Sequence, residues 1–246
     1  MTAIRETFEE TGLLLASGVL PQSETVLDAS RESIHTGRTL FRDFLKQHAL
    51  SADVQALLPF TEWITPLGSS RCVSASHEPQ LTAPTNCIEQ HSRFHTRFYV
   101  AFLPSSQRAS GFSSGVTQHR LPTPDGGQEV VEARFVHPWD ALAKHRSKKI
   151  ALMPPQHYIL TTLADLLVGR ETRPHQRERV ERLSAGAFGR MVIFPQVGKR
   201  DANGRTALVY EGDEARGGLR GRLHRSVVLF SPETKVGRTA CPLEQR

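Results

Sequence analysis

The chain has few cysteines and no long apolar segment. Its cysteines, Cys72, Cys87 and Cys241, are odd in number and lack CxxC spacing, which argues against a disulfide framework and against a zinc site. No apolar run approaches the roughly 18 residues that a membrane-spanning helix needs. No secretory signal is visible, and the last residues, EQR, differ from a peroxisomal SKL-type signal. We therefore expect a soluble protein in a reducing intracellular compartment, with no organelle assigned.

The composition is that of a sizeable folded protein with an excess of positive charge. The 246 residues are 38% hydrophobic and 23% charged, and the formal net charge is +6. A chain of this length can bury a core of its own. The positive charge raises the local concentration of anionic ligands such as nucleotides, coenzyme A or nucleic acid. The basic clusters at Lys144 to Lys149 and Arg170 to Arg182 are more simply explained as solvated helical faces.

Three carboxylates are concentrated in the string RETFEETGL, residues 5–13. Glu6, Glu9 and Glu10 have spacings of i, i+3 and i+4, so a helix places them on one face. Such an acidic cluster is stabilised by a cation, and all-carboxylate ligands suit Mg²⁺ or Mn²⁺. Arg5 lies one helical turn before Glu9 and is expected to orient that carboxylate, while Gly12 ends the helix. The alternative is the polar, capped end of an ordinary surface helix.

Residues 5–13 also resemble the second half of the Nudix box. The complete box is Gly, five residues, Glu, seven residues, then Arg-Glu-apolar-any-Glu-Glu-any-Gly-apolar. Every specified position of the second half is matched except Thr7, where the family prefers an aliphatic residue. The box glycine and its first glutamate would lie upstream of Met1, as would the first strands of the Nudix fold. We therefore expect either an incomplete chain or a relic that has lost part of its site, and a poorly stable protein as written.

The remaining pattern predicts helices first and strands later. A loose apolar face favours one helix over Val26 to Leu58, ended by Pro59. The DANG sequence at residues 201–204 is typical of a tight turn between two strands. Predicted strands lie at residues 62–66, 71–75, 93–103, 129–136, 191–197, 207–210 and 225–230. Predicted helices lie at residues 138–144 and 152–167, and residues 172–183 are expected to form either a charged helix or a linker. The helix at 152–167 is expected to bury a stripe made of Ile159, Leu160, Leu163, Leu166 and Leu167.

The order of these segments along the chain sharpens the resemblance. The opening box, EWITP at 62–66, RFHTRFYVAFL at 93–103, EVVEARFVHPWDAL, SKKIALMPPQHY and the late EGDEA at 211–215 together look like the acyl-coenzyme A diphosphatase subfamily of Nudix hydrolases. The implied fold class is α/β, a Nudix-type α/β/α sandwich that is N-terminally truncated and has a C-terminal strand-rich extension. The expected domains are a truncated Nudix domain at 1–168 and a charged linker with a β-rich extension at 169–246. The first domain would contain a helical insertion at about 16–60 and a mobile loop at 104–127.

The resemblance implies hydrolysis of coenzyme A or acyl-coenzyme A to 3′,5′-ADP and a 4′-phosphopantetheine derivative. Mg²⁺ or Mn²⁺ held by Glu6, Glu9 and Glu10 would neutralise the diphosphate and lower the pKa of an attacking water. Glu129 is implied as the catalytic base or a further metal ligand, alongside Glu6 and Arg5 as catalytic residues. The alternative for Glu129 is a solvent-facing residue at the start of a strand.

Other residues are assigned simpler roles. His91 and His95 lie at or beside a strand, where they would not converge on a metal. Trp63 and Trp139 are expected to pack rather than to stack on adenine. Ser147 to Lys149 could contact a 3′-phosphate, although a solvated face is the simpler expectation.

Three hypotheses for the function follow. The first is an active acyl-coenzyme A diphosphatase with a small-molecule diphosphate substrate. The second is a non-catalytic Nudix relic that binds a nucleotide or a protein partner. The third is a basic nucleic-acid-binding module, which has only charge in its favour, so we expect no nucleic acid and no membrane span. The oligomeric state is not predicted.

Overall fold

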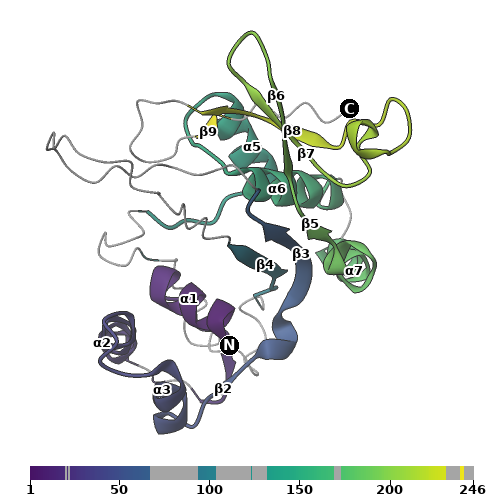
Figure 1. Cartoon of the computed structure of the whole chain (residues 1–246). Helices are drawn as coiled ribbons and strands as arrows, with labels where there is room; N and C mark the ends of the chain where they lie inside the picture. The colour runs from purple at the N-terminus through teal and green to yellow at the C-terminus, as the bar shows by residue number, and fades with distance from the viewer. Residues whose placement is uncertain are drawn as a thin grey trace, which may run out of the picture. The chain divides into compact units, whose positions relative to one another are not determined.

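The computed structural model describes residues 1–19, 21, 23–66, 94–103, 123, 132–168, 173–230 and 239–240. The chain divides into two compact units (Figure 1). Unit one comprises Met1–Pro59, Tyr99–His137 and Arg170–Ala185, and unit two comprises Phe60–Phe98, Pro138–Gly169 and Gly186–Arg246. Both contain helices and strands, as expected for an α/β chain. No helix within the described ranges is long and apolar enough to cross a membrane.

Unit one is mainly helical. Its helices are α1 (Thr2–Thr11), α2 (Glu24–His35), α3 (Phe41–Gln47) and α7 (Arg173–Ala185). The short strands β1 (Ala16–Ser17) and β2 (Ser51–Ala52) pair antiparallel, and the one-turn helix η1 (Val54–Ala56) follows. Of the two alternatives for residues 172–183, a charged helix or a linker, the structure has the helix, α7.

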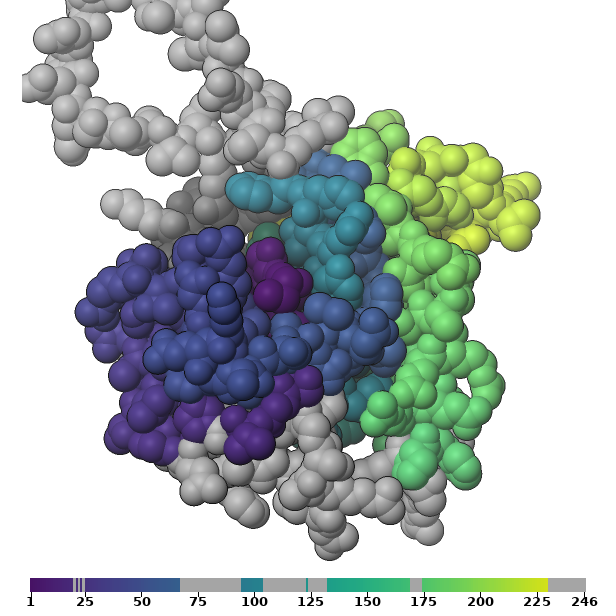
Figure 2. Space-filling view, turned by 90° about the horizontal axis from the view of Figure 1, so that it is seen from below, coloured from purple at the N-terminus to yellow at the C-terminus, as the bar shows by residue number. Residues whose placement is uncertain are grey.

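The core of unit one is built around α1. Ile4 and Phe8, one helical turn apart, are 0% and 1% exposed. The Phe8 ring stacks on Phe44 of α3 with 5.6 Å between ring centres. In the space-filling view the purple N-terminal residues lie beside the blue residues that follow them in the chain (Figure 2). A helix of ten residues is marginal alone in water, so this packing holds α1 in place.

The predicted long helix at 26–58 is wrong, because the chain leaves the helical conformation twice. Gly37, with φ of 71°, lies in the turn between α2 and α3. Ala49, with φ of 52°, lies just after α3. Pro59 does not end a helix but lies inside strand β3 (Leu58–Ile64), where its carbonyl oxygen accepts a hydrogen bond from Ser184 Oγ at 2.8 Å. Loose apolar periodicity therefore concealed two breaks that depend on single residues.

Unit two contains two sheets. In the first, β3 lies between β4 (His95–Val100) and the short parallel strand β5 (Val192–Ile193). The second has the order β6 (Gln196–Arg200), β7 (Thr206–Val209), β8 (Arg225–Phe230) and β9 (Thr239–Ala240), all antiparallel. The predicted strands at 62–66, 93–103, 207–210 and 225–230 are confirmed by β3, β4, β7 and β8. That at 191–197 divides into β5 and the start of β6.

Two helices of unit two, α5 (Pro138–Arg146) and α6 (Pro154–Leu166), pack on each other (Figure 1). Both confirm predicted helices that begin at proline. The predicted buried stripe of α6 is wrong, because the side chains of that stripe are only partly buried. His157, Tyr158 and Ala164 are buried instead, since Tyr158 packs edge-on against Trp63 and Tyr210.

Some predicted elements lie partly or wholly outside the described residues. Of the predicted strand at 129–136, the described residues 132–136 form no strand. The predicted strand at 71–75 and the predicted loop at 104–127 lie outside the described residues, apart from Thr123. The DANG turn is confirmed: Asp201 N–H donates to Arg205 O at 2.8 Å, and Gly204 N–H donates to Asp201 O at 3.0 Å.

Candidate functional site

The candidate site is the polar side of α1. The helix ends at Gly12, which has φ of 72° and donates its N–H to Phe8 O at 2.9 Å, as the sequence predicts. Ile4 and Phe8 turn the apolar side of α1 into the core. Glu9 is also buried, with only 5% of the residue exposed. A buried carboxylate needs bonded partners, so the surroundings of Glu9 define the site.

Arg5 joins two of the three predicted metal ligands. Its Nη1 donates to both carboxylate oxygens of Glu9 at 3.1 Å, and its Nη2 donates to Glu6. The Glu9 side chain is 7% exposed, whereas those of Arg5 and Glu6 are about 40% exposed. The predicted pairing of Arg5 with Glu9 is thus present, and Glu6 is part of the same cluster. Charge-assisted bonds of this kind fix the direction in which the two carboxylates point.

The C-terminal end of α1 has a second arginine that the sequence analysis missed. Arg31 of α2 donates from Nε to the backbone oxygen of Glu9 at 2.7 Å, and from Nη1 and Nη2 to Thr123 Oγ1 and O at 3.0 Å each. Thr123 donates its N–H to Thr11 O at 3.0 Å. A signal was available, because Arg31 stands between Leu27 and Ile34 on the apolar face of its helix. A charged residue in such a position marks a buried polar contact.

The donor chemistry of the cluster suits a hard cation, but its arrangement is incomplete. Carboxylate oxygens are the ligands that Mg²⁺ and Mn²⁺ prefer. In the described part of the chain, however, no three His, Cys, Asp or Glu side chains lie close enough together to hold a metal ion. Both oxygens of Glu9 bind Arg5, and Glu10 is half-buried on the same helix. The structure therefore brings Glu6 and Glu9 together on Arg5 but does not assemble a three-ligand site.

Most other residues singled out in the sequence have identifiable surroundings. Trp63 packs as predicted: it is 4% exposed, and its Nε1 donates to Thr61 Oγ1 at 2.9 Å. Trp139 does not, since it is 42% exposed and has the Arg146 guanidinium 6.0 Å from its ring centre. On β4, His95 Nε2 lies 2.6 Å from Glu62 Oε2.

The contacts of the described residues do not test the predictions for Glu129, for His91 and for the segment 147–149. Glu129 and His91 lie outside the described residues. Ser147, Lys148 and Lys149 are exposed just after the C-terminal end of α5, where their N–H groups donate to carbonyl oxygens of that helix. Contact of these residues with a phosphate stays a prediction.

Unit two contains a polar pair that was not predicted from the sequence, formed by buried Tyr158 and partly buried His224. His224 has its Nδ1 2.7 Å from Glu211 O, and its Nε2 lies 3.1 Å from Tyr158 Oη. A carbonyl oxygen only accepts, so Nδ1 donates to Glu211 O, while Nε2 and Tyr158 Oη share the second hydrogen bond. Burial raises the pKa of Tyr158. The pair orients Tyr158 within the aromatic cluster formed with Trp63 and Tyr210.

Comparison with known proteins gives one family and two relatives. The NUDT19 Nudix domain matches residues 1–163 of the chain. The acyl-coenzyme A diphosphatase NUDT19 of Xenopus laevis is 26% identical over 174 residues, which are 65% of this chain and 38% of that protein. The protein of the same name from Gallus gallus is 26% identical over 180 residues, which are 66% of this chain and 39% of that protein. The chain thus spans about two fifths of the length of these relatives. No solved structure gives a significant match.

Proposed function

Because the chain belongs to the NUDT19 Nudix domain family, we propose that it hydrolyses a diphosphate linked to a nucleoside, with coenzyme A or acyl-coenzyme A as the substrate. The products would be 3′,5′-ADP and a 4′-phosphopantetheine derivative. The observation that carries the proposal is the α1 cluster, in which Arg5 binds Glu6 and Glu9 of the Nudix pattern. The names of the two relatives support an acyl-coenzyme A substrate.

We propose that Glu6, Glu9 and Glu10 hold Mg²⁺ or Mn²⁺. When bound, the cation would neutralise the diphosphate and lower the pKa of the attacking water. A carboxylate has about four lone-pair sites, so Glu9 keeps acceptor capacity while it binds Arg5. The role of Arg5 is to hold the Glu9 side chain in one orientation, which reduces the entropy lost when a ligand is bound.

The test is a set of Glu→Gln substitutions at positions 6, 9 and 10, each of which keeps the size of the side chain. We expect kcat/KM for coenzyme A, measured as release of 3′,5′-ADP with Mg²⁺ or Mn²⁺ present, to fall by about 100-fold or more. Glu32→Gln is the matched control, because Glu32 lies on α2, is 68% exposed in its side chain and pairs with the exposed Arg38. Unchanged turnover in Glu9→Gln and Glu10→Gln would remove both residues from the mechanism.

Glu129 is proposed as the general base or as an additional ligand. Its role can be tested by Glu129→Gln, with Glu132→Gln as the control, since the Glu132 side chain is 62% exposed and pairs with Arg134. We expect only the substitution at 129 to lower kcat by about 100-fold, with coenzyme A still bound. Equal activities of the two variants would exclude a catalytic role for Glu129.

A second candidate function is binding of a nucleotide or coenzyme A without turnover. One observation favours it. Within the described ranges, no three His, Cys, Asp or Glu side chains, those of α1 included, lie close enough together to hold a metal ion. Calorimetry with coenzyme A, run beside the product assay, separates the two functions. Saturable binding with no product at any Mg²⁺ or Mn²⁺ concentration would support the non-catalytic function and overturn the hydrolase.

A further inference from the structure

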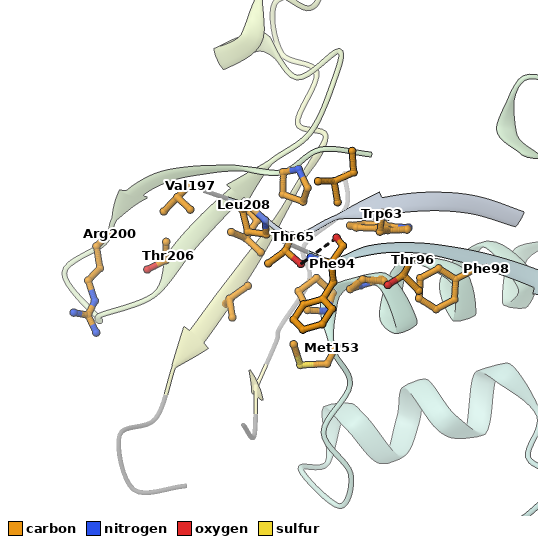
Figure 3. A pocket seen from close by; sticks show the side chains of 16 residues that line it. Trp63, Thr65, Phe94, Thr96, Phe98, Met153, Val197, Arg200, Thr206 and Leu208 are labelled. Atoms are coloured by element: carbon orange, nitrogen blue, oxygen red, sulfur yellow. Dashed lines mark hydrogen bonds between the residues drawn. The ribbon is translucent and has the colours of Figure 1, made fainter. Parts of the chain in front are cut away.

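Unit two contains an open apolar pocket that neither the α1 cluster nor the proposed hydrolysis uses. Its volume is about 490 Å³, within the roughly 300 to 1,000 Å³ range of small-molecule sites. Three regions of the chain line it: β3, β4 and the residue before β4, with Trp63, Phe98 and Phe94; the start of α6 with Met153; and strands β6 to β8 (Figure 3). The pocket lies entirely within unit two.

Several large apolar side chains of this pocket face solvent. Phe94 is 68% exposed, Met153 is 47% exposed and Val197 of β6 is 48% exposed. These residues are far apart in the sequence, yet all three line one pocket. Exposed apolar side chains scattered singly need no explanation, whereas several gathered at a concave site favour an apolar ligand.

Several polar groups at the Trp63 end of the pocket already have partners. Trp63 Nε1 donates to Thr61 Oγ1 at 2.9 Å. Thr65 donates its N–H to Phe94 O at 2.9 Å, and Phe94 donates its N–H to Thr65 Oγ1 at 3.2 Å. A ligand that enters this end therefore gains dispersion and burial of apolar surface rather than hydrogen bonds. This selects a hydrocarbon chain over a sugar or a base.

Among the side chains labelled in Figure 3, the one farthest along the pocket from Trp63 is a cation, Arg200. In Figure 3, Arg200 lies at the end of the β6–β7 hairpin, away from Trp63 and Phe98. Its Nε donates to Gly204 O at 2.8 Å, which fixes the plane of the guanidinium at the hairpin turn. Guanidinium N–H groups bind carbonyl and carboxylate oxygens well. The pocket is thus apolar along most of its length and cationic at one end.

We propose that this pocket binds a fatty acyl chain, with the acyl carbonyl oxygens at Arg200 and the hydrocarbon chain against Trp63, Phe94, Met153 and Val197. The proposal rests on the proposed function in one respect, the choice of an acyl chain as the occupant of the pocket. Thioester and free carboxylate share the acyl carbonyl, so a free fatty acid can probe the pocket. Such an acid has no diphosphate and is not hydrolysed.

The probe is dodecanoate, and the reporter is Trp63. The chain has two tryptophans, so Trp139→Phe leaves Trp63 as the only indole, and it lines the pocket. We expect a saturable change in tryptophan emission on titration with dodecanoate below its micellar concentration. Affinity should rise from octanoate to dodecanoate by about two- to fourfold for each added CH₂. Arg200→Gln should weaken dodecanoate several-fold while leaving dodecanol unchanged.

Val197→Asp and Val192→Asp form a matched pair for the same titration. Both valines lie on strands of unit two and are 48% and 43% exposed, but only Val197 lines the pocket. We expect Val197→Asp to raise the Kd for dodecanoate at least tenfold and Val192→Asp to leave it within about twofold, with both variants folded by circular dichroism. No saturable signal with any chain length, or equal effects of the two substitutions, would overturn the proposal.

Failure of the pocket and failure of the hydrolase are distinguishable. Dodecanoate binding without any release of 3′,5′-ADP would support the pocket and count against the enzyme. Turnover of coenzyme A with no dodecanoate binding would do the reverse. Dodecanoate binding that weakens as the protein concentration rises would show a second copy of the chain in the pocket, and would overturn the proposal.

Discussion

Arg31 binds the backbone of Glu9: its Nε donates to the Glu9 carbonyl oxygen at 2.7 Å, although 22 residues separate the two positions. Arg31 is 7% exposed. Its positive charge lies at the C-terminal end of α1, where the helix dipole favours a cation. The same contact fixes the backbone that presents the Glu9 and Glu10 carboxylates. Support of the candidate site therefore comes from α2 as well as from α1.

Replacement of Arg31 by Met should destabilise unit one. The Glu9 and Thr123 oxygens would each lose a charged donor, and buried acceptors without donors cost about 1–3 kcal/mol apiece. We expect the free energy of unfolding, measured in urea, to fall by about 2–4 kcal/mol. Arg38→Met is the control, because the Arg38 side chain is 62% exposed and its ion pair with Glu32 lies on the surface. Exposed pairs contribute up to about 1 kcal/mol, so equal losses in the two variants would contradict the buried role of Arg31.

Gly12→Ala and Gly37→Ala separate backbone strain from crowding. The two glycines have φ of 72° and 71°, so an alanine is strained by about 1 kcal/mol at either position. A Cβ at Gly12 would lie 3.3 Å from Thr123 Oγ1 and 3.5 Å from Arg31 Nη1, whereas a Cβ at Gly37 meets nothing within 4 Å. We expect losses of about 2–3 kcal/mol at Gly12 and about 1 kcal/mol at Gly37 in urea unfolding. A Gly12 variant no less stable than the Gly37 variant would show that the contact with Thr123 tolerates a methyl group.

His157 should make the protein less stable in acid. Burial, followed by repulsion from His145 and Arg146, lowers the pKa of His157 from 6.5 to about 4. The unfolded chain therefore binds a proton below about pH 6.5 that the folded chain does not bind until about pH 4. Stability should fall through this window by about 3 kcal/mol at most. The slope should flatten in His157→Gln and persist in His175→Gln, because His175 is exposed on α7; thermal melts across this pH range measure both.

Asp213 and Arg225 should be a major source of stability in unit two. Asp213 is fully buried, and Arg225 donates to its two carboxylate oxygens at 2.7 and 2.5 Å. The hydrogen bonds from Arg225 hold the pKa of Asp213 below its ordinary 3.8. Its contribution is thus present above pH 3.8 and is lost as the pH falls below that value.

Substitution tests this contribution. Asp213→Asn leaves Arg225 with only its longer ion pair to Glu214 Oε1 at 3.7 Å, and should cost about 3 kcal/mol in urea unfolding at neutral pH. Asp201→Asn is the control, since Asp201 pairs with Arg205 in the exposed hairpin turn and should lose less. A loss at Asp213 no greater than that at Asp201 would show that Arg225 is solvated well enough to stand alone.

Local patterns in the sequence predicted several elements correctly. The opening helix with its Gly12 end, the strands around Trp63 and Phe98, the proline-initiated helices α5 and α6 and the turn at 201–204 all depend on residues near one another in the chain. Propensity, capping and turn chemistry act over a few residues, so the sequence states them directly. The helix predicted over 26–58 is wrong because single residues with positive φ interrupt it. The apolar periodicity continues across these residues and therefore does not reveal the interruptions.

The sequence by itself determined the RETFEETGL pattern, the family resemblance it carries and the pairing of Arg5 with Glu9, because four residues make one helical turn. Only the tertiary structure decided what lies against that turn. Arg31 and Thr123 reach the end of α1 from positions far along the chain. The apolar pocket likewise forms from strands and a helix start that the sequence separates by more than a hundred residues. Such contacts depend on burial and hydrogen bonding between residues that are distant in the sequence, so local sequence patterns do not predict them.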